Sequence, residues 1–322
     1  MKCLVTGAGG MVGSHMVEKL TRGGYQVLGT YYKPTIDINE ISSHIKMVEC
    51  DIRYAQRVEQ IIVDFMPDQI YHLAAQSYPT VSWIRPEETL DINIKGTIAV
   101  YEAIKAARKQ KDSAYNPMVV VACSSAEYGQ SLNELEVEKV FVDENTPLKP
   151  LHPYGVSKVG QDLLSYQYYM NDGIRCIRAR IFNSTGTRKV GDVTSDFIHR
   201  AVVAVENGSY TIRVGNLDTR RAIMDQRDLV NALMLLAVKG KAGEAYNISS
   251  EKIYQMSEII FMIEKSIGHA LRTEIDEKLL RSADEHIIAG DVTKLKADTG
   301  WRQEIPMERT IADMLEYWRK KI

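Results

Sequence analysis

The chain has 322 residues, and its 40 basic and 42 acidic side chains give a formal net charge of −2. This balance lacks the basic excess of a protein that binds nucleic acid, so we expect no nucleic-acid partner. No apolar run reaches the roughly 18 residues of a membrane span, and MKCLVTGAGG leads into a strand pattern without a signal region; we therefore expect a cytoplasmic protein without a membrane partner.

Short apolar runs bounded by Gly, Asp or Ser alternate with amphipathic stretches, which is typical of a parallel sheet covered by helices. We predict strands at Lys2–Val5, Gln26–Tyr31, Lys46–Glu49, Gln69–Leu73, Met118–Cys123, Ile174–Arg180 and Ala245–Ile248. We predict helices at Met11–Thr21, Ala55–Asp64, Pro86–Arg108, Pro153–Asn171, Val193–Glu206, Arg227–Val238, Gln255–Ser266 and Met307–Arg319.

The alternation loosens after about Phe182, where loops rich in charge and Gly separate single helices and strands. We therefore predict an α/β fold: a Rossmann-type doubly wound parallel sheet with a smaller, partly interleaved C-terminal substrate domain. The NAD(P)-binding domain would take residues 1–181 and about 225–248. The substrate domain would take residues 182–224 and 249–322.

The run LVTGAGGMVGSH lies between the first predicted strand and the first predicted helix, and it spaces Gly7, Gly10 and Gly13 three residues apart. Glycines here permit a tight turn and let the backbone and the helix N-terminus approach a pyrophosphate. Glycine-rich turns have many uses, but a strand before and a helix after favour a dinucleotide site. Met11 and Val12, which open the helix, belong to the same predicted site.

Two further strand ends fit a dinucleotide. Asp51, followed by Ile52, could accept a hydrogen bond from an adenine amino group, or it could cap the next helix. Small side chains after the fourth strand would let the backbone pass close to the cofactor, although packing alone also explains them. The small residues are Ala74 and Ala75, and Leu73, which ends the predicted strand before them, belongs to the same predicted site.

The end of the second strand decides between NAD(H) and NADP(H). An acidic residue there would bind the ribose hydroxyls, and a basic residue would accommodate a 2′-phosphate. The sequence GTYYKP offers Tyr31, Tyr32 and Lys33 instead of Asp or Arg. We therefore expect NADP(H) slightly more than NAD(H), although a single Lys in a loop is usually only solvated.

Tyr154 and Lys158 open a predicted helix four residues apart and so share one face. A nearby ammonium would lower the pKa of the phenol toward the range needed for acid/base work on a hydroxyl or carbonyl. The alternative is a surface Tyr and Lys at ordinary helical spacing. Ser124, at the end of the fifth strand in VVVACSSAEYG, favours catalysis because open parallel sheets present their ligand groups there.

Five motifs, TGAGGMVG, HLAAQS, SSAEYG, YGVSK and FN, resemble those of the extended short-chain dehydrogenases/reductases, over nearly the whole chain. Within that superfamily, HLAAQSYPTVSW and VGNLDTRR resemble the GDP-mannose 4,6-dehydratases and the GDP-4-keto-6-deoxymannose reductases. The resemblance implies hydride transfer at C4 of a sugar on a nucleoside diphosphate, most like a GDP-mannose 4,6-dehydratase. It also implies a GDP-linked substrate and a homodimer or homotetramer.

The same resemblance implies a set of residues that bind the substrate. Asn183 would contact the sugar nucleotide, and Arg221 and Arg281 would grip the diphosphate or the nucleotide. Asn216, with Asp218, could instead shape its loop. The motifs add four further positions to this set: Ser82, Ser125, Arg188 and Val214.

A dehydratase of this kind needs a carboxylate base for the C5 proton, which the resemblance puts two residues before the Tyr-Gly pair. That position is Ala126, and the nearest acid is Glu127. Glu127 could serve as a displaced catalytic base if the strand end bulges by one residue, or it could be a structural hydrogen-bond acceptor. The alternatives to a dehydratase are therefore a C4 ketoreductase or C4 dehydrogenase, and a non-catalytic dinucleotide sensor.

The four cysteines, Cys3, Cys50, Cys123 and Cys176, form no C-x-x-C pair and lie in or beside apolar runs. We expect them to be small buried hydrophobic residues. The seven histidines show no ligand spacing, so we predict no metal site.

Overall fold

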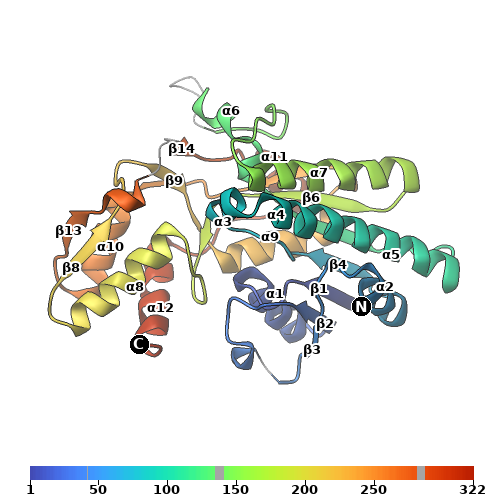
Figure 1. Ribbon diagram of the computed structural model, residues 1–322, viewed down its shortest axis with the longest axis horizontal. Coiled ribbons are helices and arrows are strands. Elements are labelled where there is room, and N and C mark those ends of the chain that lie inside the picture. The colour runs from blue at the N-terminus through green and yellow to red at the C-terminus, as the bar shows by residue number, and fades with distance from the viewer. Residues whose placement is uncertain (42, 135–140, 281–286) are drawn as a thin grey trace.

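The computed structural model of the protein describes residues 1–41, 43–134, 141–280 and 287–322. Its centre is a seven-stranded sheet in the order β11-β6-β5-β4-β1-β2-β3, in which every neighbouring pair is parallel (Figure 1). This order confirms the predicted Rossmann-type fold. The strands are β1 (Lys2–Thr6), β2 (Gln26–Tyr31), β3 (Lys46–Glu49), β4 (Gln69–His72), β5 (Met118–Ser124), β6 (Cys176–Ile181) and β11 (Ala245–Ile248).

Helices bury both faces of the sheet. One core lies against α1 (Met11–Arg22), α9 (Gln226–Lys239) and α11 (Thr293–Thr299), and the other lies against α2 (Ala55–Phe65), α5 (Gly96–Gln110) and α7 (Pro153–Asp172). Successive side chains of β5 point to opposite faces of the sheet, so this strand contributes to both cores. Val120 packs in the first core, and Val119 and Val121 pack in the second. A strand buried on both faces reads as a continuous apolar run, which explains why β5 was predictable.

The helix predicted at Pro86–Arg108 is interrupted. It begins as α4 (Pro86–Leu90), passes through one π-helical stretch at Asp91–Lys95, and continues as α5. Such a wide turn often occurs at functional sites, and here it carries the buried Asn93. Three short helices were not predicted: α3 (Pro79–Ile84), α6 (Gln130–Asn133) and α11.

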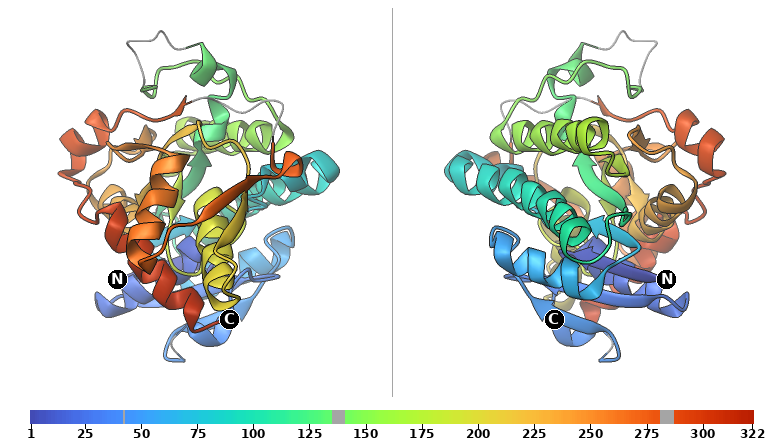
Figure 2. Two further views of the ribbon diagram at one scale, coloured as in Figure 1. Left: turned by 90° about the vertical axis from the view of Figure 1, so that its left-hand side faces the viewer. Right: turned by 90° about the vertical axis from the view of Figure 1, so that its right-hand side faces the viewer.

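A smaller lobe, at the left of Figure 1 and facing the viewer in the left panel of Figure 2, has a core of its own. Its helices are α8 (Val193–Glu206), α10 (Met256–Ile267) and α12 (Met307–Arg319). Its short strands pair as β8 (Thr211–Val214) with β13 (Arg272–Ile275), and as β9 (Arg220–Ala222) with β12 (Ile253–Gln255) and β14 (Ile287–Ile288). The pair β7 (Ser184–Thr185) and β10 (Met224–Asp225) completes the described strands.

The predicted assignment of all of residues 249–322 to the substrate domain does not hold for α11. Val292, Leu295 and Trp301 pack in the same core as α1 and α9, so α11 lies with the sheet domain. The rest of the predicted division stays a prediction.

The segment after β2 joins the two parts through Glu40. Its carboxylate accepts hydrogen bonds from the Tyr317 hydroxyl at 3.1 Å and pairs with Arg188 at 3.3 Å and Lys321 at 2.8 Å. Burial opposes the charge, but Lys321, Tyr317 and Arg188 together lower the pKa of Glu40. The end of α12 is therefore tied to the first domain.

Within the part of the chain that the structure describes, no helix is both long enough and apolar enough to cross a membrane. All four cysteines are buried and free of disulfides. This confirms that they act as small buried hydrophobic residues.

Candidate active site

The turn between β1 and α1 can adopt its backbone path only with glycine at two positions. Gly7 has a φ of +73°, and a Cβ at that position would lie 2.7 Å from the Ala74 nitrogen. A Cβ at Gly13 would lie 2.1 Å from the Gly7 oxygen. Gly10 precedes α1 and makes no side-chain cap, so the helix N-terminus at Met11 and Val12 suits an anion such as a dinucleotide pyrophosphate.

The turn lies where the strand order reverses, because β1 separates β2 from β4. Ligands of open α/β sheets bind in the crevice at this point. Leu73, Ala74 and Ala75 follow β4 there, and the Ala74 nitrogen donates to the Thr6 hydroxyl at 3.2 Å. The structure thus brings together the two segments that we predicted on either side of a cofactor.

Asp51 and Ile52 are both buried at the end of β3. The Asp51 carboxylate accepts the Arg53 backbone nitrogen at 3.0 Å and pairs with its guanidinium at 2.6 Å. Burial opposes ionisation, but these Arg53 contacts lower the pKa of Asp51. Capping of α2 by Asp51 is wrong, since Tyr54 occupies the cap position without a side-chain bond.

The end of β2 presents aromatic and basic groups. Tyr31 is half-buried and Tyr32 is exposed, and the Lys33 ammonium lies 5.2 Å from the centre of the Tyr32 ring. Lys33 has a φ of +44° and is close enough to Asp51 to help lower the pKa of that carboxyl. A cation therefore stands beside the predicted adenosine pocket.

The predicted catalytic side chains meet at the end of β5. His152 caps α7 by accepting the Gly155 nitrogen at 3.0 Å, which fixes the first turn of the helix at Tyr154. The Tyr154 and Ser124 hydroxyl groups are hydrogen-bonded. The Lys158 ammonium lies 5.7 Å from the centre of the Tyr154 ring. All three side chains are buried, so the surface interpretation of the Tyr and Lys is wrong.

Burial dominates the acid/base properties of this group. It raises the pKa of Tyr154 to about 12, although the hydrogen bond with Ser124 works in the opposite direction. It also lowers the pKa of Lys158 to about 8. The protein alone therefore does not produce the low phenol pKa expected from Lys158, so Tyr154 keeps its proton and is better suited to act first as an acid.

A buried chain of polar side chains that the sequence did not reveal holds Lys158. The ammonium donates to the Ala122 oxygen at 2.8 Å and to Gln161 at 2.7 Å, and Gln161 donates to Thr97 at 2.7 Å. Thr97 contacts His72 at 3.1 Å, and burial lowers the pKa of His72 to about 3. The signal available in the sequence was that these polar residues lie on helix and strand faces that are otherwise apolar.

The π-helical stretch contributes a second support. Its Asn93 side chain donates to Ser157 at 2.8 Å and exchanges hydrogen bonds with the backbone of Gln76. Because Ser157 lies next to Lys158 in α7, Asn93 fixes the start of that helix against the segment after β4. The interrupted helix is thus part of the site.

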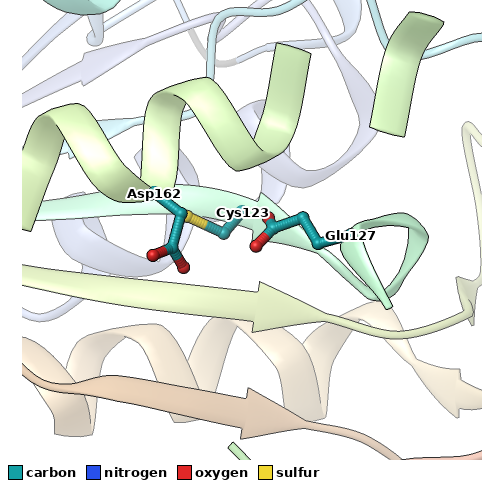
Figure 3. Close-up of side chains that lie close together, drawn as sticks. All are labelled: Cys123, Glu127 and Asp162. Atoms are coloured by element: carbon teal, nitrogen blue, oxygen red, sulfur yellow. The ribbon is translucent and has the colours of Figure 1, made fainter. Parts of the chain in front are cut away.

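Glu127 does not face the catalytic group. It ends a 3-10 turn at Ser125–Glu127, has no exposed surface, and accepts the Ser124 nitrogen at 2.8 Å. Figure 3 shows its side chain directed back toward Cys123 and Asp162. The structural interpretation of Glu127 fits these contacts, and the displaced-base interpretation does not fit a fully buried carboxyl group.

Cys123, Glu127 and Asp162 place their ligand atoms within 4.8 Å of one another (Figure 3). A guanidinium already serves this cluster: Arg180 lies 2.9 Å from Asp162 and 3.5 Å from Glu127. A cation of the protein itself thus neutralises the acids, and the donor set does not fit a metal ion.

Among the residues predicted to bind substrate, Ser125 directly follows Ser124 and Asn183 comes shortly after β6. Both are half-buried at strand ends next to Ser124 and β6. The Asn183 amide nitrogen is buried and has no partner among the described residues, as expected of a donor reserved for a ligand. Arg221 lies half-buried on β9, where it donates to the Arg220 oxygen.

Four other residues that we predicted to contact the substrate are instead buried or bonded within the protein. The Ser82 hydroxyl is buried and donates to the Pro79 oxygen inside α3. Arg188 is paired with Glu18 at 2.9 Å and with Glu40, so its charge serves the fold. Val214 is buried in β8, and Asn216 accepts the Asp218 nitrogen at 2.9 Å, which favours loop shaping. Arg281 lies outside the described residues.

Residues 4–314 match the family model of GDP-mannose 4,6 dehydratase. The chain belongs to this family. It is 27% identical to the GDP-6-deoxy-D-mannose reductase of Pseudomonas aeruginosa, over 80% of this chain and 82% of the relative. It is therefore an NAD(P)-dependent sugar-nucleotide enzyme of the extended short-chain dehydrogenases/reductases, as the motifs predicted.

Two solved structures share the fold over the whole chain. UDP-glucose 4-epimerase of Thermotoga maritima with UDP-glucose matches with a TM-score of 0.87 and 22% identity, covering 100% of this chain and 99% of that one. RMD from Pseudomonas aeruginosa complexed with NADPH matches with a TM-score of 0.82 and 24% identity, covering both chains completely. These two likenesses show that the chain has the same fold.

Proposed function

We propose that this protein reduces, or in reverse oxidises, C4 of a GDP-linked hexose without removing water. The position of Glu127 carries this proposal, because the acid nearest the catalytic group has no exposed surface and is bonded to the Ser124 nitrogen. Ala126, the position where a C5 base was expected, carries no ionisable group. Two further acids already accept hydrogen bonds from the backbone. Asp143 accepts the Asn145 nitrogen of its own turn, and Glu144 accepts the Asn247 nitrogen at 2.8 Å.

In the proposed reduction, the protein supplies the proton and the geometry. Tyr154 donates its phenolic proton to the C4 oxygen, and Ser124 hydrogen-bonds the same oxygen. Lys158 places a positive charge beside the phenolate that forms, while the Gln161 and Thr97 contacts keep the ammonium in place. When bound, the nicotinamide supplies the hydride to C4.

We expect the purified protein to consume one NADPH for each GDP-4-keto-6-deoxymannose, seen as loss of absorbance at 340 nm and as a GDP-6-deoxyhexose by mass. The matched incubation with GDP-mannose and NADP should yield no 4-keto-6-deoxy sugar, because the site supplies no base for C5. Formation of that product would establish a dehydratase instead. C4 inversion of a GDP-hexose without net change in cofactor would also contradict the proposal.

We propose NADP(H) as the preferred cofactor, supported by Lys33 beside the predicted adenosine pocket and by the lack of an acid at the end of β2. Lys33→Glu should lower the ratio of kcat/KM for NADPH to that for NADH by at least roughly tenfold, because it puts a negative charge where the 2′-phosphate would lie. Lys109→Glu, an equal charge change at an exposed position on α5, is the control. An unchanged ratio would show that Lys33 is only solvated.

The substrate would lie between the sheet domain and the smaller lobe. We propose that Asn183 and Ser125 contact the sugar and that Arg221 and Arg281 contact the diphosphate or the base. Their support is the unpartnered amide of Asn183 and the suitability of guanidinium groups for phosphate oxygens. A cytoplasmic location stays a prediction.

An apolar stripe on α7 supports a homodimer. Val156, Leu163, Tyr166 and Met170 are between 43% and 59% exposed and recur at helical spacing. Solvent-exposed apolar residues that gather on one helix are typical of an interaction surface. We propose that α7, with the neighbouring α5, packs against a second copy of the chain (Figure 2, right).

A further inference from the structure

We propose that Glu127 is a positioning residue for the proposed hydride transfer: its carboxyl group holds the Ser124 amide in place, and its protonation state acts on Tyr154. The inference rests on the proposed function. It differs from the displaced-base interpretation because Glu127 acts through Ser124 and Tyr154, without touching the sugar.

The hydrogen bonds around Ser124 define the first part of this role. Glu127 accepts the Ser124 nitrogen at 2.8 Å, and the Ser124 hydroxyl in turn accepts the Ala126 nitrogen at 3.2 Å. A serine hydroxyl has one donor and two acceptor positions. The reciprocal bonds therefore use one acceptor position and fix the backbone, which leaves the proton and the second acceptor position for Tyr154 and a C4 oxygen.

The second carboxylate oxygen of Glu127 has no hydrogen-bond partner among the described residues and lies 3.5 Å from the Arg180 nitrogen. Arg180 is already engaged, because Asp162 lies at 2.9 Å and the guanidinium also donates to Tyr128 at 3.1 Å and to the Glu144 oxygen at 2.9 Å. Glu127 is thus held by one oxygen, and the other can accept a proton without breaking a hydrogen bond.

Every element packed around Glu127 presents a titratable group. The groups are Cys123 on β5, Tyr154, Lys158 and Asp162 on α7, Arg180 on β6, and Tyr128 on its own turn, with Glu144 reached through Arg180. Burial, and then the charge of Asp162, raise the pKa of Glu127 to about 8, although Arg180 and Lys158 oppose them. Glu127 is therefore protonated more easily than an exposed glutamate.

The sign of the effect follows from Coulomb's law. Ionised Glu127 raises the pKa of Tyr154, and protonated Glu127 does not. In reduction Tyr154 must carry its proton and Lys158 its charge, so activity falls as pH rises through the pKa of Lys158, which burial lowers to about 8, before the higher pKa of Tyr154 is reached. A negative Glu127 raises both pKa values. A neutral side chain at this position should move the fall to lower pH.

The test compares kcat against pH in three variants. Glu127→Gln keeps an acceptor for Ser124 and removes the charge, so kcat should be near wild type at low pH while the alkaline limb moves down by roughly one pH unit. Glu127→Leu removes the acceptor as well, and kcat should fall by roughly tenfold to a hundredfold with the NADPH Kd unchanged within twofold. Glu144→Gln, a second acid of the same network that does not contact Ser124, should match wild type.

The proposal is overturned if the alkaline limb of kcat against pH is the same in Glu127→Gln as in wild type. Because this comparison uses Glu127→Gln alone, it remains decisive even if Glu127→Leu does not fold. A measurement that needs no substrate distinguishes a failure of this inference from a failure of the proposed function. In protein labelled with 15N-serine, the Ser124 amide should titrate with a midpoint near that of Glu127, and the titration should vanish in Glu127→Gln and persist in Glu144→Gln. A Ser124 amide that does not titrate in wild type would equally refute the proposal.

Discussion

Replacing Tyr154 by Phe should reduce turnover by at least roughly a hundredfold, because it removes the only ionisable atom of the side chain and leaves the ring to pack. The Ser124 hydroxyl and Lys158 stay in place, since Lys158 is held by Ala122 and Gln161 and not by the phenol oxygen. The NADPH Kd should therefore stay within about threefold of wild type. Steady-state rates and fluorescence titration with NADPH measure the two quantities.

Tyr166→Phe is the matched control, because Tyr166 lies on the same helix with its side chain 43% exposed. It should leave both quantities unchanged. A loss of only a few-fold in Tyr154→Phe would show that the proton comes from another group.

Replacing Asp162 by Ala should lower the free energy of unfolding by about 3–5 kcal/mol, measured by urea denaturation. The carboxylate is fully buried and pairs with Arg178 at 2.5 Å and Arg180 at 2.9 Å, whose side chains are 13% and 5% exposed. Removing it leaves two guanidinium groups close together with insufficient compensating charge. That cost exceeds the loss of the hydrogen bonds alone.

A surface pair provides the comparison. Glu251 lies 2.8 Å from Lys296, and both side chains are largely exposed. Glu251→Ala should change the free energy of unfolding by less than about 1 kcal/mol. Equal effects of the two variants would mean that the buried network is no more important for stability than a solvated pair.

The elements that were predicted well are those whose signal is local. The glycine turn at Gly7–Gly13 and the buried strand β5 follow from neighbouring residues, and so does the pairing of Tyr154 with Lys158 on one helical turn. Ser124 was placed correctly because a strand end in a parallel sheet has one position relative to its neighbours. In each of these cases, residues that are close together in the sequence determine the local structure.

The direction of Glu127 was not predictable, because it depends on residues far along the chain. Its carboxyl turns inward toward Asp162 on α7 and Arg180 on β6, and no local pattern links the three. Arg188 is a similar case: it was predicted to bind substrate, but its guanidinium pairs with Glu18 and Glu40 in the fold. The π-helical stretch escaped notice because its side chains keep a helical pattern.

The contacts of Glu40 bear on how the two ligand sites influence each other. Glu40 follows β2 in the sheet domain, whereas Tyr317 and Lys321 belong to the end of the chain and Arg188 to the loop that leads into α8. A movement that separates the two parts must break these contacts together. If binding at either site moves the two parts relative to each other, occupancy of the dinucleotide site and occupancy of the sugar-nucleotide site are thermodynamically linked through this segment. Reciprocity requires that each ligand change the affinity for the other by the same factor.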